Sequence, residues 1–555
     1  MSIESIDAGG VAQELSEKFK DLAVGDVSVS VSVNEKIPQK PHELTEGRKY
    51  GDCYIFDYQK FKKGASRPGS ENDVARLKHD FTALNFNVYD YLNLTKGETL
   101  NALKEAAKKD HSQSKYFVCC FLTHGEEGKL LMFDKFINID DILKCFSRSS
   151  CETLKGKPKI FIFQACRGSC CEEGVPIDST DFGSVKDNPD DLDFLIVYST
   201  YEGKVSFKTK DPLGSKNNHG SYFIDELCRT LEQFSDELDL LQILTIVNYR
   251  VAYLFETQKT KNEKYRSKKQ MPSFTSRLRT EVKFNRKIRM FESLHTQYFD
   301  YRRRKTSSGL KSTEKPLEDK KIYIIQKPKR IMFLSLLNTR KNFESDLTYS
   351  ASNLWSSVAS KGYQREEKRN WSEKELMVFL KEVAGRDFSS TDCLICFIAC
   401  KVKGDYLCDV KENTFLMQQI VEQFTGEKCP TLVQKPKIFI FMLSSPARKS
   451  WWPCVSAEST DGDSSSSMIP VHADILETAI TFEKSWQLEG VTEKFCNIFG
   501  GESSEDFLSQ LTRMNEELVK DYGFYSPSNN NLATFCVNST LTKTLILNNT
   551  KCKNN

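Results

Sequence analysis

The sequence of 555 residues lacks several features that would mark particular classes of protein. It contains no run of about 18 apolar residues, so it predicts no membrane-spanning helix. Its amino terminus, MSIESIDAGGVAQEL, has neither the basic nor the apolar segment of a secretory signal. The formal net charge is only +3, which gives no indication of a nucleic-acid or membrane partner. We therefore expect a cytoplasmic protein that binds neither nucleic acid nor membranes.

Metal-binding patterns are also scarce. Without a secretory route, the 18 cysteines are expected to be reduced thiols. Cys393 and Cys396 have the CxxC spacing, but the surrounding TDCLICFIAC predicts a strand, in which residues three apart point to opposite faces. There is no second well-spaced pair, and the chain has only 7 histidines. We predict no metal and no cofactor.

What the sequence does contain is an alternation of strand and helix patterns between residues 49 and 284. Strands are predicted at 53–56, 86–92, 115–122, 157–163, 193–200 and 271–284, and helices at 74–84, 100–109, 139–147, 221–234 and 238–255. This alternation predicts a mostly parallel sheet with right-handed crossovers. Residues 169–192 interrupt it, because they are rich in Asp, Ser, Gly and Pro and indicate an exposed loop.

Two segments lie outside this pattern. Residues 1–43 offer one possible helix and one alternating stretch, which is too little for an adaptor domain, so we expect a short leader. Residues 285–321 are charged and lack periodicity, which predicts a linker. Its basic run at 301–305 could alternatively be a nuclear-import or nucleic-acid patch.

The chain then repeats itself. KPKIFIF at 157–163 recurs at 435–441, an offset of 278 residues. The segment CCFL at 119–122 resembles ICFI at 395–398, which aligns Cys120 with Cys396 at an offset of 276. Near-constant offsets indicate a duplicated domain, with residues 322–548 as the second copy.

Two strand ends in the first copy carry residue types that suit nucleophilic catalysis. His124 follows one predicted strand and Cys166 follows another. If those strands are neighbours, the thiol and the imidazole meet at the carboxyl edge of the sheet. The imidazole would raise the thiolate fraction and later protonate the leaving group. Gly125 allows close backbone approach, and its N–H and that of Cys166 could form an oxyanion hole. Taken alone, Cys166 could also be a structural cysteine.

The first copy, over about residues 45–284, resembles caspases. The similar stretches are SRPGSENDVARL (66–77), CCFLTHGEEG (119–128), KIFIFQACRG (159–168), DFLIVYST (193–200), VSFK (205–208), GSYFIDEL (220–227) and KKQMPSF (268–274). The resemblance implies a caspase-like three-layer α/β/α sandwich with a mostly parallel six-stranded sheet, present twice in tandem. It also implies a cysteine endopeptidase that cleaves proteins after aspartate, made as a zymogen and of the effector type in apoptosis or related signalling.

The resemblance assigns roles to individual residues. Cys166 would be the nucleophile and His124 the general acid/base. Arg67, Gln164 and Lys208 would bind the carboxylate of the P1 aspartate, which needs paired positive charge when it is buried.

The segment Ser206–Lys208 would pair with the extended substrate, and Phe207 would contact the P2 side chain. Lys208 departs from the arginine typical of the family and loses its planar fork, so we expect a less sharp preference for aspartate.

The resemblance also divides residues 44–284 into a large subunit (about 44–173), a processing linker (174–191) and a small subunit (about 192–284). Asp178, before Ser179, is the expected self-processing site, with Asp187, Asp190 and Asp191 as weaker candidates. Asp26 could release the leader. The basic residues of 256–270 could favour acidic substrate flanks or could form a solvated loop.

The second copy lacks these site residues. Aligned on the two anchors, His124 becomes Cys400, Gly125 becomes Lys401, and QACRG becomes MLSSP at 442–446. With no imidazole to activate Ser444, and no SRPG-like loop, we predict a pseudo-caspase domain.

Two questions stay open at this point. The second copy could pair with the first through the strand segments 531–547 and 271–284, or two first copies could form a homodimer. The alternative to a protease is a catalytically weak or inactive caspase-like regulator that binds other caspases.

Overall fold

The computed structural model describes most of both copies. The described residues are 50–126, 128–167, 192–201, 206, 220–255, 269–284, 322–338, 344–404, 406–444, 470–482, 485–501, 503–522 and 534–547. Asp26, Asp178, Phe207, Lys208 and the two segments expected to be a leader and a linker lie outside them. Among the described residues, no helix has the length and apolar character needed to cross a membrane.

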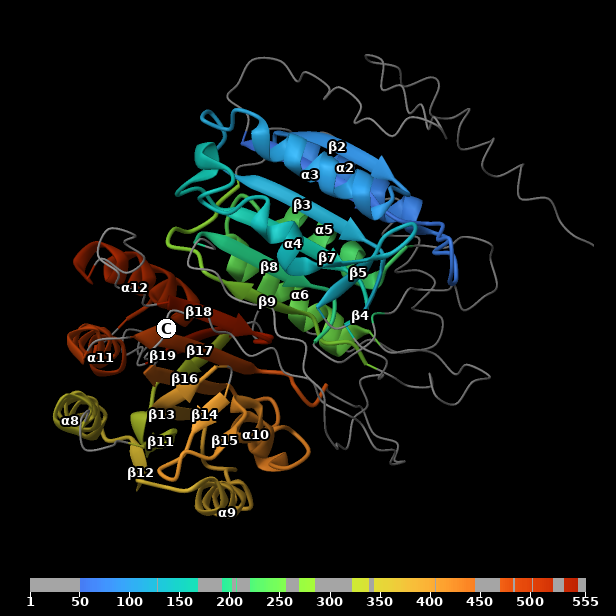
Figure 1. Ribbon diagram of the computed structural model, residues 1–555. Helices are drawn as coiled ribbons and strands as arrows, with labels where there is room; N and C mark the ends of the chain where they lie inside the picture. The colour runs from blue at the N-terminus through green and yellow to red at the C-terminus, as the bar shows by residue number, and fades with distance from the viewer. Residues whose placement is uncertain are drawn as a thin grey trace, which may run out of the picture.

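The first copy is built on six strands, and it occupies the upper part of Figure 1. They are β1 (Gly51–Asp57), β2 (Phe86–Leu92), β3 (Phe117–Leu122), β7 (Lys159–Gln164), β8 (Phe194–Tyr198) and β9 (Ser273–Ser276), in the order β2-β1-β3-β7-β8-β9. All neighbours are parallel except β8 and β9. The central strands β1, β3 and β7 are buried along their whole length, which explains their continuous apolar runs.

Helices cover both faces of this sheet. Helices α2 (Ser70–Ala83), α5 (Tyr222–Phe234) and α6 (Leu240–Leu254) pack on one face, and α3 (Lys96–Lys108) and α4 (Ile139–Lys144) pack on the other. A hairpin sheet of β4 (His124–Glu126), β5 (Lys129–Leu131) and β6 (Phe136–Asn138) follows β3, and a 3-10 turn, η1, spans Glu152–Leu154.

The second copy repeats this arrangement. Its strands are β11 (Ile331–Leu337), β12 (Gln364–Arg369), β13 (Cys393–Lys403), β16 (Lys437–Ser444), β17 (Ile475–Phe482) and β18 (Thr534–Ser539). Helices α8 (Glu344–Ser360), α11 (Ser485–Gly500) and α12 (Phe507–Tyr522) lie on one face, and α9 (Glu373–Ala384) and α10 (Met417–Val421) lie on the other. The expected three-layer α/β/α fold, present twice with mostly parallel six-stranded sheets, is confirmed.

Short elements complete the second copy. Strands β14 (Tyr406–Cys408) and β15 (Thr414–Phe415) extend from β13, and β10 (Ile322–Ile325) pairs with β19 (Thr544–Leu547). Three 3-10 turns are η4 (Pro328–Arg330), η5 (Glu422–Phe424) and η6 (Pro430–Leu432).

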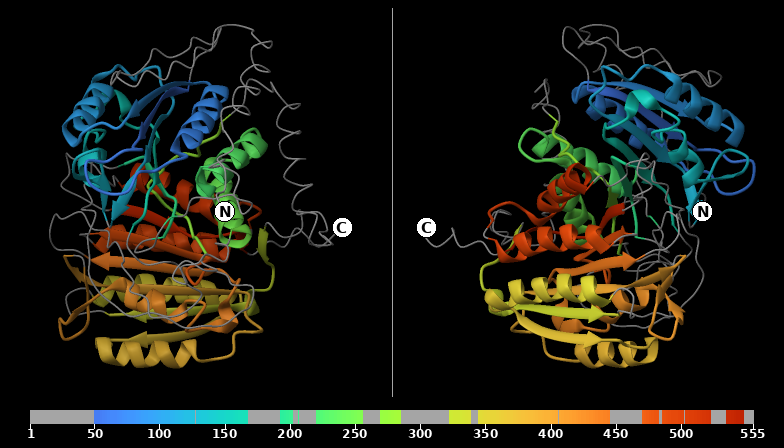
Figure 2. Two further views of the ribbon diagram at one scale, coloured as in Figure 1. Left: turned by 90° about the vertical axis from the view of Figure 1, so that its right-hand side faces the viewer. Right: turned by 60° about the vertical axis from the view of Figure 1, so that its left-hand side comes forward.

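The two copies share one sheet of 14 strands, because β9 pairs antiparallel with β18. The pairing is symmetric about Thr275 opposite Asn538. One apolar cluster runs beneath α2, α5 and α6 and continues beneath α8, α11 and α12, so the core is continuous across the junction. Figure 2 shows the two copies stacked along this common sheet.

Helix side chains make the junction reciprocal. Asn248 of α6 donates through Nδ2 to the carbonyl of Leu541, at 3.2 Å. Asn515 of α12 donates in the same way to the carbonyl of Leu278, at 3.1 Å. Each copy therefore offers the same kind of contact to the other, as in a two-fold dimer interface.

The register of the strands corrects the alignment of the two copies. Phe117 lies opposite Lys159 in the first copy, and Leu394 lies opposite Lys437 in the second. The offset along β3 and β13 is thus 277, not 276, and Cys396 is equivalent to Cys119 rather than Cys120. The positions of the side chains support this register, because Cys120 lies on the α2 face of its sheet and Cys396 lies on the opposite, α9 face. The predicted equivalence of Cys120 and Cys396 was therefore wrong by one residue.

Two strand predictions were longer than the observed strands. The segment 271–284 forms a strand only at Ser273–Ser276. The carbonyl of Arg277 accepts from the N–H of Asp193, and that of Leu278 accepts from Asn515. The segment 531–547 divides into β18 and β19, which belong to different sheets. Cys393 and Cys396 lie in one strand and face opposite sides, as predicted.

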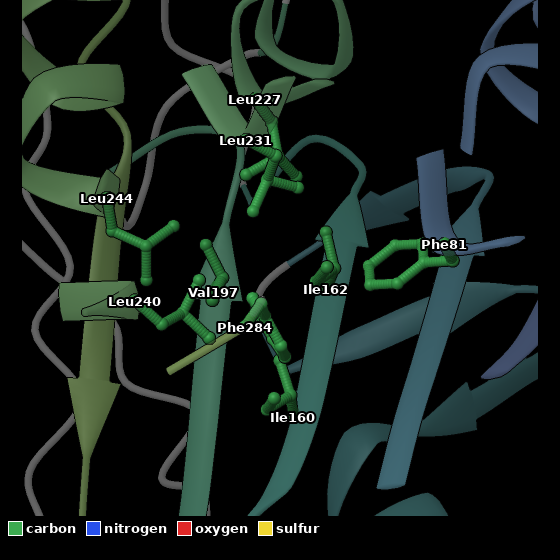
Figure 3. A pocket seen from close by; sticks show the side chains of 9 residues that line it. All are labelled: Phe81, Ile160, Ile162, Val197, Leu227, Leu231, Leu240, Leu244 and Phe284. Atoms are coloured by element: carbon green, nitrogen blue, oxygen red, sulfur yellow. The ribbon is translucent and has the colours of Figure 1, made fainter. Parts of the chain in front are cut away.

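The core of the first copy contains a small gap between the sheet and α2, α5 and α6 (Figure 3). Nine apolar side chains line it: Phe81, Ile160, Ile162, Val197, Leu227, Leu231, Leu240, Leu244 and Phe284. The lining offers no polar partner, which a buried water would need. We regard the gap as a packing feature of the core.

Candidate active site

The site forms where β3 and β7 end. The two strands are parallel neighbours, and their last paired residues are Leu122 and Gln164. Strand β3 then stops, the N–H of Thr123 bonds to the carbonyl of Gln164 at 3.1 Å, and the chain turns into β4 at His124. Cys166 follows Gln164 by two residues. The strand ends that carry His124 and Cys166 are therefore neighbours, which meets the condition on which the sequence argument depended.

The His124 ring is held by the loop between β1 and α2. Its Nε2 lies 2.9 Å from the carbonyl oxygen of Ala65. A carbonyl only accepts hydrogen bonds, so Nε2 carries the proton of the neutral ring and Nδ1 is the basic nitrogen. Phe61 packs against the ring, with centroids 4.9 Å apart. The loop thus fixes both the orientation and the tautomer of the imidazole.

Gly125 brings the backbone of β4 against the chain around Cys166. A Cβ atom at this position would lie 2.6 Å from the carbonyl oxygen of Cys166 and 3.0 Å from that of Lys129. Both are backbone atoms that cannot move aside cheaply. Only glycine fits here, which ties the residue after His124 directly to the residue expected to be the nucleophile.

The thiol of Cys166 is half-buried. Burial raises its pKa, whereas the N–H of Ser206 and the charge of Arg67 act in the opposite direction. The Ser206 N–H lies 3.5 Å from the sulfur. Ser206 also accepts a hydrogen bond through Oγ from Nε2 of Gln164, at 2.9 Å. Ser206, Gln164 and Cys166 therefore form one contact group.

Arg67 lies in the same area, and its side chain is only 4% exposed. Its Nη1 donates to the Oγ of Ser70 at 3.1 Å and to the carbonyl of Tyr58 at 3.2 Å. Burial lowers its pKa, and the negative charges of Asp57, Asp73 and an ionised Cys166 raise it. The amide oxygen of Gln164 is buried and has no hydrogen-bond partner among the described residues. A cation and an unsatisfied amide thus lie beside the thiol.

Several residues of this site were not singled out from the sequence. The Ala65 carbonyl has no sequence signal, because every residue has one. Arg167 lies 3.7 Å from the ring centroid of Tyr198 and anchors the chain next to Cys166. Asp57 ends β1 at the same carboxyl edge, and that position of a carboxylate was an available signal.

The segment directly before α5 is hydrogen-bonded to α2 near the site. Asp73 Oδ1 accepts the N–H of Ser221 at 2.7 Å. Gly220 has φ +79°, and a Cβ there would lie 2.3 Å from the same oxygen. This contact links the segment before α5 to the helix that follows the Arg67 loop.

The second copy has a different strand end. Strand β13 continues to Lys403 and pairs with β16 as far as Lys401 opposite Ser444. With the corrected register, Lys401 is equivalent to His124 and Val402 to Gly125, so the expected equivalents Cys400 and Lys401 were each one residue early. Neither Cys400 nor Lys401 is a histidine, so the position equivalent to His124 has no imidazole under either alignment. Cys400 is buried, and burial raises its pKa.

The loop that carries Arg67 is also shortened in the second copy. It spans residues 58–69 in the first copy, between β1 and α2. Its counterpart between β11 and α8 spans residues 338–343. Only six residues separate β11 from α8, against the twelve residues between β1 and α2 that include Ala65 and Arg67.

Comparisons with known proteins agree with this picture. The family model described as "Caspase domain" matches residues 51–283 and again residues 335–546. Chicken (Gallus gallus) Caspase-7 is 36% identical over 248 residues, which cover 43% of this chain and 78% of that protein. Caspase-3 of Mesocricetus auratus is 34% identical over 275 residues, covering 48% and 96%. Caspase-3 of Bos taurus is 36% identical over 239 residues, covering 42% and 84%.

Proposed function

The chain belongs to the caspase family, and on that basis we propose that its first copy is a cysteine endopeptidase that cleaves proteins after aspartate. One observation carries the proposal. Cys166 and His124 follow neighbouring parallel strands, and Gly125 packs directly against the Cys166 backbone. A structural cysteine at a strand end would need neither the oriented imidazole nor the obligatory glycine.

The reaction uses groups already named. Nδ1 of His124 takes the thiol proton, and the Cys166 sulfur attacks the carbonyl carbon of the scissile bond. The N–H groups of Gly125 and Cys166 bind the oxyanion of the tetrahedral intermediate. His124 returns the proton to the leaving amine, and the C–N bond breaks to leave a thioester. His124 then activates a water, which hydrolyses the thioester and releases the thiol.

Substrate recognition is assigned to the residues beside the thiol. Arg67, Gln164 and Lys208 would bind the P1 carboxylate, Gln164 by donating from Nε2, the same amide nitrogen that donates to the Oγ of Ser206. The segment Ser206–Lys208 would pair with the extended substrate, and Phe207 would contact the P2 side chain. In this proposal the chain is a cytoplasmic zymogen, cut at Asp178 within residues 174–191 and at Asp26, with an effector role in apoptosis or related signalling.

The second copy is proposed to be a non-catalytic domain that acts as a built-in dimer partner. Strand β18 occupies the edge of β9, the edge through which two first copies would otherwise pair. The reciprocal Asn248 and Asn515 contacts support the same pairing. His472 of the second copy also stacks on Tyr201 of the first, with centroids 4.4 Å apart. Tyr201 precedes Ser206 by five residues. The second copy therefore contacts the first copy shortly before the segment proposed to bind substrate.

Two experiments test these proposals. Hydrolysis of fluorogenic peptides with P1 aspartate is expected for the wild type and not for Cys166→Ala. Equal signals from both chains, or none from either, would favour the non-catalytic regulator. Sedimentation of the Cys166→Ala chain at micromolar concentration is expected to give a compact monomer, and a dimer at that concentration would refute the built-in partner.

A further inference from the structure

Asp57 places a buried carboxylate directly behind the arginine of the proposed P1 pocket. It is the last residue of β1, and its side chain is 3% exposed. Oδ1 accepts from the Oγ of Ser70 at 2.5 Å, and Oδ2 accepts from Nε2 of Gln59 at 2.7 Å. Oδ1 also lies 3.7 Å from Nη1 of Arg67. The carboxylate is thus held firmly and faces the guanidinium.

The arrangement gives Arg67 a resident counter-ion. A guanidinium that is removed from water is costly unless an opposite charge compensates it. Asp57 provides that compensation before any substrate is bound, and Ser70 joins the two groups by donating to Asp57 and accepting from Arg67.

A substrate carboxylate would have to share this cation. The guanidinium of Arg67, which already contacts Ser70, Tyr58 and Asp57, would then interact with two carboxylates. Two carboxylates on one arginine repel each other, and in a water-poor site that repulsion is only partly screened. Each therefore weakens the binding of the other.

We propose that Asp57 is a specificity-determining residue that sets how strongly the P1 pocket prefers a charged over a neutral side chain. The inference rests on the proposed role of Arg67 in binding P1. Asp57 holds Arg67 in a fixed, compensated state and limits the gain from the substrate's negative charge. The preference for P1 aspartate over its neutral isostere asparagine is then smaller than Arg67 and Lys208 alone would give.

The test is the ratio of kcat/KM for matched peptides with P1 aspartate and P1 asparagine. Asp57→Asn keeps the shape and the acceptor for Ser70 but removes the charge. We expect the aspartate-to-asparagine ratio to rise by about tenfold, the usual size of a charge-assisted contact, with little change for asparagine. Asp57→Ser is a second variant that removes the charge in a smaller side chain and is expected to act in the same direction.

The matched control is Asp90→Asn. Asp90 is also a carboxylate of the same domain in an ion pair, with Lys78 at 2.8 Å, but it lies on β2 away from the site. This variant should leave the ratio unchanged. Binding of the two peptides to Cys166→Ala chains, with and without Asp57→Asn, by fluorescence anisotropy gives a readout that does not depend on turnover.

The outcomes separate the two levels of the proposal. If the wild type cleaves P1-aspartate peptides and Asp57→Asn leaves or lowers the ratio, Asp57 does not limit charge selectivity and the inference is wrong. If the wild type neither cleaves nor binds such peptides, the proposed function itself fails. A raised ratio in both turnover and binding supports the inference.

Discussion

The same strand ends differently in the two copies, and the difference determines where a catalytic site is possible. In the first copy β3 stops at Leu122, and the turn at Thr123 leads His124 out of the sheet and into a hairpin. In the second copy β13 runs on without a break, so that Cys400 and Lys401 still pair with β16 before Val402 and Lys403 pair with β14 in a hairpin. The first arrangement releases His124 from the sheet, and the second keeps its equivalent, Lys401, paired with β16.

What both copies keep is equally informative. KPKIFIF forms a buried strand in each, and each contributes an edge strand to the shared sheet. The sheet and the junction therefore require the apolar strands but not the residues that follow them. A domain that had lost catalysis could still be retained for the surface that it offers to its partner.

The largest expected effect comes from making the first copy resemble the second at one residue. Gly125→Val introduces the residue found at 402, and its Cβ would clash with the backbone of Cys166. We expect kcat/KM to fall by at least about 100-fold, because small misplacements of reacting groups are that costly. Peptide hydrolysis measures it, with Gly97→Val as the control, since a Cβ at Gly97 meets no atom within 4 Å. Comparable losses in both variants would contradict the argument.

The junction between the copies should respond to pH through Asp239. This residue caps α6 and faces Asp506, which caps α12 in the second copy, with Glu281 and Lys283 nearby. Burial and the charge of Asp506 raise the pKa of Asp239 to about 6.

Because the pKa is raised in the folded state, the stabilisation from protonated Asp239 is complete below its unfolded pKa of about 4 and is lost as pH rises through about 6. Asp239→Asn keeps the cap and removes the charge, so it should stabilise the chain at pH 7.5 by about 2 kcal/mol and flatten this part of the pH profile. Urea unfolding between pH 4 and pH 8 measures both. An unaltered profile would show that Asp239 does not titrate in this range.

The reciprocal asparagines allow a direct comparison of the two sides of the junction. Asn248→Ala and Asn515→Ala each leave a buried carbonyl of the other copy without its donor. We expect each to destabilise the folded chain by about 1–3 kcal/mol, and by similar amounts, in denaturant unfolding. If only one of the two variants destabilised the chain, the two hydrogen bonds would contribute unequally to stability although their geometry is symmetric.

A smaller effect is expected from the ring contact that reaches toward the site. His472→Ala removes the partner of Tyr201, and we expect kcat/KM to fall by about threefold to tenfold, in line with a contact worth roughly 1 kcal/mol. His472→Phe keeps a ring and should restore most of the activity. If alanine and phenylalanine behave alike, the stack does not support the substrate-binding segment.

No effect is expected from restoring only the two catalytic residue types in the second copy. Lys401→His with Ser444→Cys, made in the Cys166→Ala chain, should give no hydrolysis. The second copy still has Val402 in place of the glycine and a short loop in place of 58–69, so the imidazole has no equivalent support. Hydrolysis above the Cys166→Ala background would show that the strand break is not needed.

Much of the fold and of the candidate site could be predicted from sequence because its signals are local. Continuous apolar runs predicted the strands, their alternation with helices predicted the parallel sheet, and the repeated KPKIFIF predicted the duplication. Cys166 and His124 were predicted as site residues because each directly follows a strand pattern, and Gly125 because it follows His124. The alignment of Cys120 with Cys396 was wrong by one residue. Side chains alternate between the two faces of a strand, so a shift of one residue is detected only when the face that each side chain occupies is known.

The sequence by itself determined which residues form strands, which copy carries the thiol and imidazole, and which copy has lost them. Tertiary structure alone decided that β18 occupies the edge of β9, since either edge strand could pair with another chain. It also decided that the Ala65 carbonyl orients His124 and that Asp57 lies behind Arg67. Backbone carbonyls and charges distant in the chain leave no local pattern, and only the packing of the loops on the sheet edge brings them together.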